Sequence, residues 1–240
     1  MKRLLRLLHF YFYTFSVALF FLPLYPLINH FAKKPANLKW LNRLRKIFSF
    51  FSSAFAGIYF NFKFEEPIDW SKTYIICGNH TSNLDITAII LLTQNDYVFM
   101  GKDELLNNLV TKKYFESIDI PLNRDSKMSA FRAFKKADEY LKSGISVVIF
   151  PEGQIPDQYP PVMQPFKNGP FKLAIENGID ILPVSIKNNW LIMWDDGSKH
   201  GSRPGICDIC VHKPISTKLL TSEDAESLKQ QVFAIINKEL

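Results

Sequence analysis

The sequence predicts an α/β fold in which helices flank a largely parallel central sheet and a strongly apolar helical segment comes first. From Glu65 onward, short runs rich in β-branched and aromatic residues alternate with helical stretches. This alternation is typical of parallel α/β sheets. Before Glu65 the chain is rich in phenylalanine, and no charged residue occurs between Arg6 and Lys33. We therefore expect two parts, a helical segment over residues 1–64 and a second domain over residues 65–240.

The first expected element is an apolar helix. Residues 10–28 are almost wholly apolar, and this length is close to the roughly 20 residues that cross a hydrocarbon core. Basic residues flank the stretch on both sides, so the positive-inside rule gives no orientation. Pro23 and Pro26 are expected to kink or end the helix. A cleaved signal peptide is the alternative, but no clear small-residue cleavage site follows the apolar run.

The second expected element is a basic amphipathic helix. Its apolar residues recur at spacings of three and four: Leu38, Leu41, Leu44, Phe48, Phe51 and Phe55. Lys39, Arg43 and Lys46 lie off this stripe, which suits a helix in the headgroup region of an anionic membrane. The alternative is that the stripe packs on the domain core. The net charge of +6 favours anionic partners, and without a recognised nucleic-acid motif we expect membrane lipid rather than nucleic acid.

The second domain is expected to contain five strands and at least three helices. The strands are predicted at residues 74–77, 97–100, 145–150, 181–186 and 206–211, and the helices at 129–141, 171–176 and 223–239. In such folds, functional residues gather where strands end.

The cysteine and histidine residues predict no metal site. The chain has three cysteines, an odd number that argues against a disulfide framework and suits a reducing compartment. Cys207 and Cys210 have CxxC spacing, but no second pair completes a tetrahedral zinc site. Both lie in an expected strand, so we interpret them as structural. The five histidines show no metal-like spacing.

The first expected strand leads into a histidine and an aspartate, His80 and Asp85. On a continuous helix two residues five positions apart would point roughly 140° apart, so they meet only if His80 precedes the helix. Ser82 as N-cap would place Asp85 at the third helical position. The carboxylate could then orient the imidazole while His80 takes a proton. The alternative is a helix-capping acid beside an ordinary loop histidine.

Three later segments add candidate site residues. Arg124 follows a short apolar run, and its guanidinium suits bidentate phosphate binding, although a surface salt bridge is equally consistent. The strand expected before Pro151, Glu152 and Gly153 delivers a carboxylate between a proline and a glycine, which predicts a fixed tight turn. Pro183 interrupts another expected strand, so that strand lies at an edge or is irregular there.

Together these segments resemble the glycerolipid acyltransferase superfamily, typified by bacterial 1-acylglycerol-3-phosphate acyltransferases. The matching segments, in the family's order, are Asn79 to Asp85, the block from Gly101-Lys102 through Ile118 to Arg124, Phe150 to Gly153, Phe166 to Gly169 and the strand with Pro183. The resemblance covers roughly residues 70 to 190. Matching segments in this order are far more specific than the histidine–aspartate spacing alone.

The resemblance implies a reaction and a role for each residue. His80 would deprotonate the acceptor hydroxyl, Asp85 would orient His80, and the hydroxyl would attack the thioester of acyl-CoA or acyl carrier protein. Arg124 would bind the phosphate of a 1-acylglycerol-3-phosphate, and the product would be phosphatidic acid. Glu152 and Gly153 would shape the acceptor site, where the Glu152 carboxylate would accept a hydrogen bond from the acceptor or hold a cationic partner. Lys102 and Lys167 are candidate further phosphate ligands, while Asn79, Pro151 and Pro183 are parts of the motif framework. We expect no cofactor, and a membrane location with the site on the cytoplasmic face, which in a bacterium is that of the inner membrane.

One departure from the family leaves the acceptor open. The family usually continues the third motif with Thr or Ser and then Arg, whereas Gln154 and Ile155 stand here. The acceptor could therefore be another lysophospholipid or an N-acyl amino-acid lipid. Two further alternatives are a thioester hydrolase, in which water replaces the lipid hydroxyl, and a non-catalytic membrane protein that binds anionic lipid.

Overall fold

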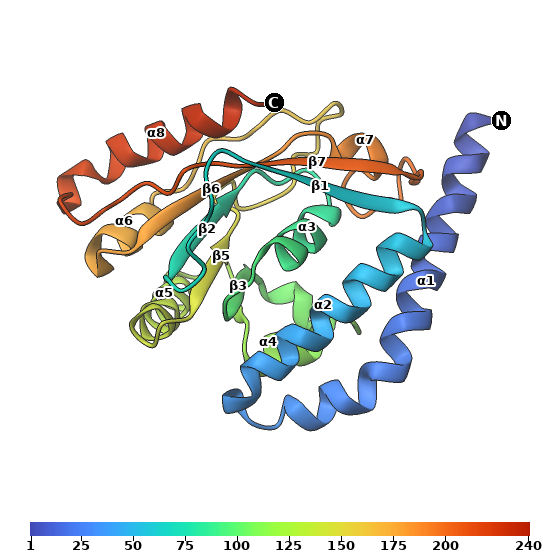
Figure 1. The fold of residues 1–240 in the computed structure, drawn as a ribbon, viewed down its shortest axis with the longest axis horizontal. Coiled ribbons are helices and arrows are strands. Elements are labelled where there is room, and N and C mark those ends of the chain that lie inside the picture. The colour runs from blue at the N-terminus through green and yellow to red at the C-terminus, as the bar shows by residue number, and fades with distance from the viewer.

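The computed structural model describes residues 1–240 apart from the side chain of Pro35, and over these residues the strands form one seven-stranded sheet (Figure 1). The strand order is β1-β7-β6-β2-β5-β3-β4. Neighbouring strands run parallel except β6 and β7, which are antiparallel. The strands are β1 (Ile58–Phe64), β2 (Tyr74–Gly78), β3 (Tyr97–Lys102), β4 (Ile120–Leu122), β5 (Ser146–Ile149), β6 (Asp180–Ile186) and β7 (Gly205–Val211). The expected α/β fold with a largely parallel sheet is confirmed.

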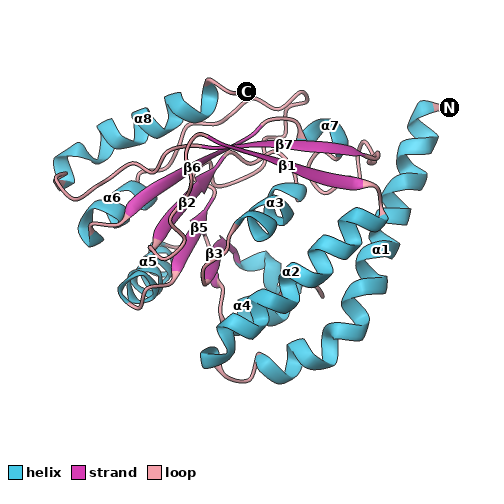
Figure 2. Cartoon of the chain, in the orientation of Figure 1, coloured by secondary structure: helices cyan, strands magenta, loops and turns pink.

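Helices cover both faces of the sheet (Figure 2). They are α1 (Lys2–Phe31), α2 (Leu38–Phe55), α3 (Leu84–Leu92), α4 (Lys112–Ser117), α5 (Lys127–Lys142), α6 (Gly169–Asn177), α7 (Asn189–Ile192) and α8 (Ala225–Asn237), with short 3-10 turns at Pro35–Asn37, Asp103–Asn107 and Ser222–Asp224. Side chains alternate across a strand, so Ile75 joins the core beneath α5, α6 and α8 whereas Ile76 joins the core beneath α3.

The sheet extends beyond the strands that the sequence predicts. All five expected strands are present, with ends within two residues of the expected ones. β1 and the short β4 were not predicted. β1 pairs with β7 along its whole length, from Ile58 opposite Gly205 to Phe64 opposite Val211. The division at residue 64 stays a prediction, but the sheet crosses it.

The first helix runs through both of its prolines. α1 continues from Lys2 to Phe31 with Pro23 and Pro26 inside it, so the expectation that the helix could end there is wrong. A proline removes one backbone donor from a helix, but contacts with α2 hold α1 in place. Ser16 Oγ donates to the carbonyl of Ser52 at 2.7 Å. An 18-residue window of α1 has a mean hydropathy of 1.7, so the helix is long and apolar enough to cross a membrane.

The amphipathic helix α2 packs on the domain core along most of its stripe. Leu38, Leu41, Leu44 and Phe48 are buried, whereas Phe51 and Phe55 are about half exposed. The core-packing alternative therefore describes the first part of the stripe.

α2 also carries a buried ion pair that the pattern of apolar residues does not predict. Arg45 Nη1 lies 3.0 Å from Asp119 Oδ2, and both side chains are almost fully buried. The same carboxylate accepts the backbone N–H of Phe99 on β3. Because this pair joins α2 to the sheet, α2 belongs to the same packed unit as the strands.

Candidate active site

The candidate site lies at one edge of the sheet, where β6, β2 and β5 end side by side. These strands are parallel, so their carboxyl ends meet at that edge, the usual position of a site in such a sheet. The loop after β2 carries His80, the loop after β5 carries Glu152, and the segment after β6 carries Asn189. Three segments far apart in the sequence therefore converge on one region.

His80 and Asp85 form a hydrogen-bonded pair. His80 Nδ1 lies 3.0 Å from Asp85 Oδ2. His80 sits in the loop, as the spacing requires, but α3 begins at Leu84 with Asn83 as N-cap. The N-cap expected at Ser82 is therefore one residue too early, and Asp85 is the second helical residue. Ser82 Oγ still accepts the N–H of Leu84 at 3.0 Å.

The Asp85 carboxylate is fully buried and receives four hydrogen bonds. Its Oδ2 also accepts the backbone N–H groups of Thr81 at 2.6 Å and Ser82 at 2.8 Å, and its Oδ1 accepts from Asn189 Nδ2 at 2.9 Å. Donors of this kind stabilise the charged carboxylate. A carboxylate can only accept, so Nδ1 of His80 carries the hydrogen and Nε2 is left as the basic nitrogen. The His80 side chain is 14 % exposed, which leaves a small opening for a substrate.

Two buried polar side chains hold the backbone around His80. Asn79 bridges β2 to β6, because its Nδ2 donates to the carbonyl of Ile186 at 2.9 Å and its Oδ1 accepts the N–H of the same residue at 2.7 Å. Glu152 Oε1 accepts the backbone N–H of His80 at 2.7 Å, and Glu152 Oε2 accepts that of Gln164 at 2.6 Å. Burial raises the pKa of the Glu152 carboxyl to about 7.

The position of Glu152 differs from the one that the sequence suggested. We expected its carboxylate to accept a hydrogen bond from the acceptor or to hold a cation. Instead both oxygens bind backbone N–H groups and the side chain is 3 % exposed. Glu152 therefore connects the third motif to the first, and a substrate hydroxyl would have to compete with two short hydrogen bonds.

Arg124 lies beside the turn of the third motif. Gly153 has φ +84°, and a Cβ atom placed on it would stand 3.8 Å from Cζ and Nε of Arg124. The Arg124 side chain is exposed, so the guanidinium is available to an anion beside that turn.

The two lysines and Pro151 take different positions. Lys102 is the last residue of β3 and is half-buried, whereas Lys167 is exposed. The backbone N–H of Lys167 donates to the carbonyl of buried Pro151 at 2.8 Å. The loop that carries Lys167 therefore runs beside the third motif.

Pro183 lies in an interior strand, at a break in the hydrogen-bond ladder. It pairs with Cys77 on the β2 side, so β6 is not an edge strand. On the other side, β7 pairs with β6 only from Val184 onward, and an isolated bridge joins Ile181 to Ile215. Of the two positions that the sequence left open, the irregular one is correct, since a proline lacks the N–H that a continuous ladder would use.

The segment after α7 completes the site and was not recognised in the sequence. Asp195 has a left-handed backbone with φ 54°. Its N–H donates to the carbonyl of Thr81 at 3.1 Å, and its carbonyl accepts the N–H of Asn83 at 2.9 Å. These bonds fasten the segment to the His80 loop. Burial raises the pKa of the Asp195 carboxyl, and a positive charge on His80 acts in the opposite direction.

An aromatic cluster supports the same segment. The ring of Tyr159, in the proline-rich loop after the third motif, stacks on His200 at 4.5 Å and meets Trp194 edge-on at 5.4 Å. Trp194 is 3 % exposed, whereas Asp196, Ser198 and Lys199 in the loop that follows it are exposed. In the sequence, the tryptophan at the start of this polar segment was the signal that could have indicated a buried contact.

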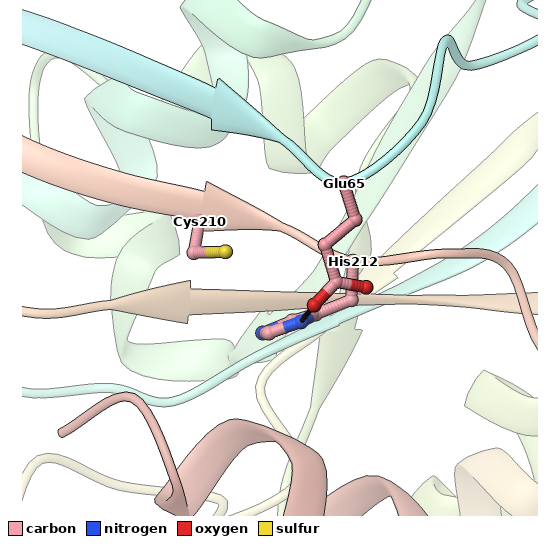
Figure 3. A group of neighbouring side chains, drawn as sticks. All are labelled: Glu65, Cys210 and His212. Carbon is pink, nitrogen blue, oxygen red and sulfur yellow. Dashed lines mark hydrogen bonds and ion pairs between the residues drawn. The ribbon is translucent and has the colours of Figure 1, made fainter.

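A separate group of possible metal ligands, Glu65, Cys210 and His212, is drawn in Figure 3. Both ring nitrogens of His212 already have partners, Glu65 Oε1 and Ser185 Oγ, each at 2.7 Å. Ser185 Oγ in turn donates to the carbonyl of Ile236 on α8 at 3.2 Å. Cys210 pairs with Ser185 of β6, and the N–H of His212 donates to the carbonyl of Pro183, so the group lies beside the C-terminal half of β6. We interpret it as a hydrogen-bonded tie between the sheet and the C-terminal helix.

The chain is similar to one family model and to several curated proteins. A model of the family described as Acyltransferase matches residues 59–187. A 1-acyl-sn-glycerol-3-phosphate acyltransferase of Haemophilus influenzae is 25% identical over 218 residues, which are 87% of this chain and 83% of that protein. One of Chlamydomonas reinhardtii is 26% identical over 170 residues, 70% of this chain and 50% of that protein. The chain thus spans about half the length of several curated relatives that it matches.

A solved structure shares the fold. The crystal structure of the 1-acyl-sn-glycerophosphate acyltransferase of Thermotoga maritima superposes with a TM-score of 0.81 at 21% sequence identity, over 99% of this chain and 95% of that one. The family match covers more than half of the chain, from β1 to the end of β6, and includes the His80–Asp85 pair, Arg124 and the Glu152 turn. The chain therefore belongs to the acyltransferase family.

Proposed function

We propose that the protein transfers a fatty acyl group from an acyl thioester to the free hydroxyl of a 1-acylglycerol-3-phosphate, which gives phosphatidic acid. The observation that carries the proposal is the His80–Asp85 pair, in which a fully buried carboxylate holds Nδ1 and leaves Nε2 as the base. The pair lies at the sheet edge to which β5 delivers Glu152 and beside which Arg124 is exposed. Relatives named for this activity support the choice of acceptor.

The reaction follows from the position of the proton on His80. Nε2 of His80 takes the proton of the acceptor hydroxyl while the hydroxyl oxygen forms a bond to the thioester carbonyl carbon. Asp85 accepts from Nδ1–H throughout and offsets the charge of the imidazolium. When the C–S bond breaks, the thiolate leaves and takes the proton from Nε2. The products are an ester and a free thiol, and His80 returns to its starting state.

The polar head of the acceptor would lie toward Arg124. A guanidinium binds a phosphate with two parallel hydrogen bonds, and Arg124 is exposed against Gly153, next to the turn that holds His80. Lys102 and Lys167 are second candidates for phosphate contacts. Glu152 and Gly153 contribute by fixing the shape of this region.

The N-terminal helices would keep the site at a membrane. α1 exposes large apolar side chains along its length, including Leu4, Leu8, Tyr11, Phe15, Leu19 and Leu22, and α2 adds Trp40, Phe50, Phe51 and Phe55. In water such a surface would be costly, whereas a lipid surface accepts it. We place the protein at a membrane with the site on the cytoplasmic face, where acyl-CoA and acyl carrier protein are available.

One observation favours a second candidate acceptor. Asp195 is hydrogen-bonded through its backbone to Thr81 and Asn83 of the His80 loop, and Gln154 and Ile155 stand where the family usually has Thr or Ser and then Arg. A carboxylate repels a phosphate monoester, so a lyso-lipid with another head group, such as an N-acyl amino-acid lipid, is the alternative.

The test is acyl transfer by membranes that contain the wild type, His80→Ala or the control His30→Ala, an exposed histidine on α1. Labelled acyl-CoA and labelled acyl carrier protein are offered with lysophosphatidic acid, other lysophospholipids and an N-acyl amino-acid lipid. Loss of the base should lower the rate about 10²-fold or more, with no change in the control.

Each product identifies one candidate. Phosphatidic acid from the wild type alone supports the proposed function, and acylation of another acceptor alone moves the assignment to that acceptor. Free fatty acid without a new diacyl lipid identifies a thioester hydrolase. Equal behaviour of wild type and His80→Ala on every acceptor favours a lipid-binding protein without catalysis.

A further inference from the structure

Asn189 contacts the side of Asp85 that faces away from His80. It is the first residue of α7 and is 0 % exposed. Its Nδ2 donates to Asp85 Oδ1 at 2.9 Å, across 104 positions of sequence. The other carboxylate oxygen, Oδ2, serves His80 and the backbone N–H groups of Thr81 and Ser82. Asn189 therefore supplies the side-chain donor that holds Oδ1.

We propose that Asn189 is a positioning residue, which fixes the plane of the Asp85 carboxylate so that Oδ2 stays aligned with His80 Nδ1. The inference rests on the proposed function. A carboxylate bound through one oxygen can rotate about its χ2 bond, and rotation would take Oδ2 away from the imidazole. A hydrogen bond to each oxygen prevents this rotation.

The orientation of the Asn189 amide supports this role. Of the side-chain atoms that the structure describes, Asn189 Oδ1 is among those that are buried without a hydrogen-bond partner. A buried acceptor without a partner is unfavourable. A flip of the amide would place Oδ1 against the Asp85 carboxylate, with oxygen facing oxygen. The contact with Asp85 therefore determines the orientation, and the unpaired oxygen is its consequence.

The preceding residue provides a matched control. Asn188 is also an asparagine beside α7, but its amide contacts β7 instead of the His80–Asp85 pair. Its Nδ2 donates to Asp208 Oδ2 at 3.1 Å, and its Oδ1 accepts the N–H of Asp208 at 2.7 Å. Loss of Asn188 should loosen the docking of the segment without removing a donor to Asp85.

The test compares Asn189→Leu, Asn189→Asp and Asn188→Leu with the wild type. Asn189→Leu keeps the branched shape but removes the donor, and we expect kcat to fall about 10- to 100-fold, by analogy with the loss of a partner that orients a metal-binding side chain. KM for both substrates should change little, because Asn189 does not contact them. Asn188→Leu should lower the unfolding temperature while its kcat per folded molecule stays near that of the wild type.

Asn189→Asp tests the proposal through the pH dependence of kcat, which should not change if Asn189 has a purely structural role. Two carboxylates at this distance repel each other, so the second of the two protons is lost only at a raised pH. At low pH the introduced carboxyl keeps its proton and donates it to Asp85 Oδ1, as the amide does. As the pH rises it loses that proton and repels Asp85. The ratio of variant to wild-type kcat should therefore fall as the pH rises. A constant ratio, or equal losses of kcat in Asn189→Leu and Asn188→Leu, overturns the proposal.

A second measurement separates this proposal from the proposed function. With selectively 15N-labelled histidine, the Nδ1–H proton of His80 is assigned by its absence in His80→Ala. Asn189→Leu should shift that resonance upfield as the bond to Asp85 weakens, and Asn188→Leu should not. This shift is expected even where no acceptor is acylated, which would count against the proposed function alone. An unchanged resonance in Asn189→Leu contradicts the positioning role whatever the activity.

Discussion

The imidazole of His80 lies flat on the phenyl ring of Phe150, with ring centroids 4.1 Å apart and an angle of 15° between the planes. Phe150 follows β5 directly, so the strand that delivers the third motif also holds the ring of the first motif. The Asp85 contact fixes one ring atom, and the stack fixes the ring plane. Together they leave little freedom in the direction of His80 Nε2.

Removal of the stack should lower turnover without unfolding the protein. An aromatic pair is worth about 0.5–1.5 kcal/mol beyond its buried area, which corresponds to about 2- to 12-fold in rate. We expect Phe150→Leu to lose kcat within that range and Phe150→Tyr to retain most of it. Steady-state kinetics with the acceptor that the wild type acylates measures the effect, and a change in KM with an unchanged kcat would contradict a role in holding the ring.

The stability of the protein should depend on pH through Glu152. Burial raises the pKa of its carboxyl from 4.5 to about 7. The folded state therefore binds more protons than the unfolded state between these pH values. This contribution to stability is complete below about pH 4.5 and is lost as the pH rises to about 7, with a slope of up to about 1.4 kcal/mol per pH unit.

A variant that cannot titrate isolates this contribution. Urea unfolding of the wild type and Glu152→Gln at several pH values from 5 to 8 gives the difference in their free energies of unfolding. The wild type should lose stability relative to Glu152→Gln as the pH rises. If the difference stays constant over this range, Glu152 does not titrate there.

Arg124 should act on the binding of a phosphate-bearing acceptor. Arg124→Ala is expected to raise KM for lysophosphatidic acid about tenfold or more, since a hydrogen bond to a charged group contributes about 1.5–3 kcal/mol. Arg124→Lys should recover part of the loss, because an ammonium keeps the charge but not the two parallel bonds. Arg132→Ala, an exposed arginine on α5, is the control. Equal KM values in all four proteins would exclude Arg124 from the phosphate site.

The buried Arg45–Asp119 pair should be critical for folding. Arg45→Met removes the positive charge and leaves the buried Asp119 carboxylate without its partner. The free energy of unfolding should fall by about 3–5 kcal/mol. Arg43→Met, at an exposed position on the same helix, should change stability by less than about 0.5 kcal/mol. Denaturant unfolding in detergent measures both. A similar small change in both variants would show that the pair contributes little.

Local sequence pattern predicted much of this molecule. Five of the strands are runs of β-branched and apolar residues, namely β2, β3, β5, β6 and β7. Neighbouring residues along the chain were therefore enough to predict that these strands are buried. Polar residues directly after β2 and β5 gave His80, Asp85 and Glu152 as candidates. β1 was missed although its residues Ile58–Phe64 alternate in the manner of a strand, because the aromatic residues before it made the region resemble a continued helix.

The sequence by itself determined which groups could do chemistry: a histidine and an aspartate spaced to meet at a helix start, an arginine, and a glutamate held in a tight turn. The tertiary structure alone decided how they work together. Asn189 reaches Asp85 across 104 positions, and Glu152 reaches the backbone of His80 across 72. Contacts of this range depend on the order of strands in the sheet, which places β6 and β5 on either side of β2. The spacing of residues along the chain does not predict the strand order, because the strand order arises from the packing of the whole domain.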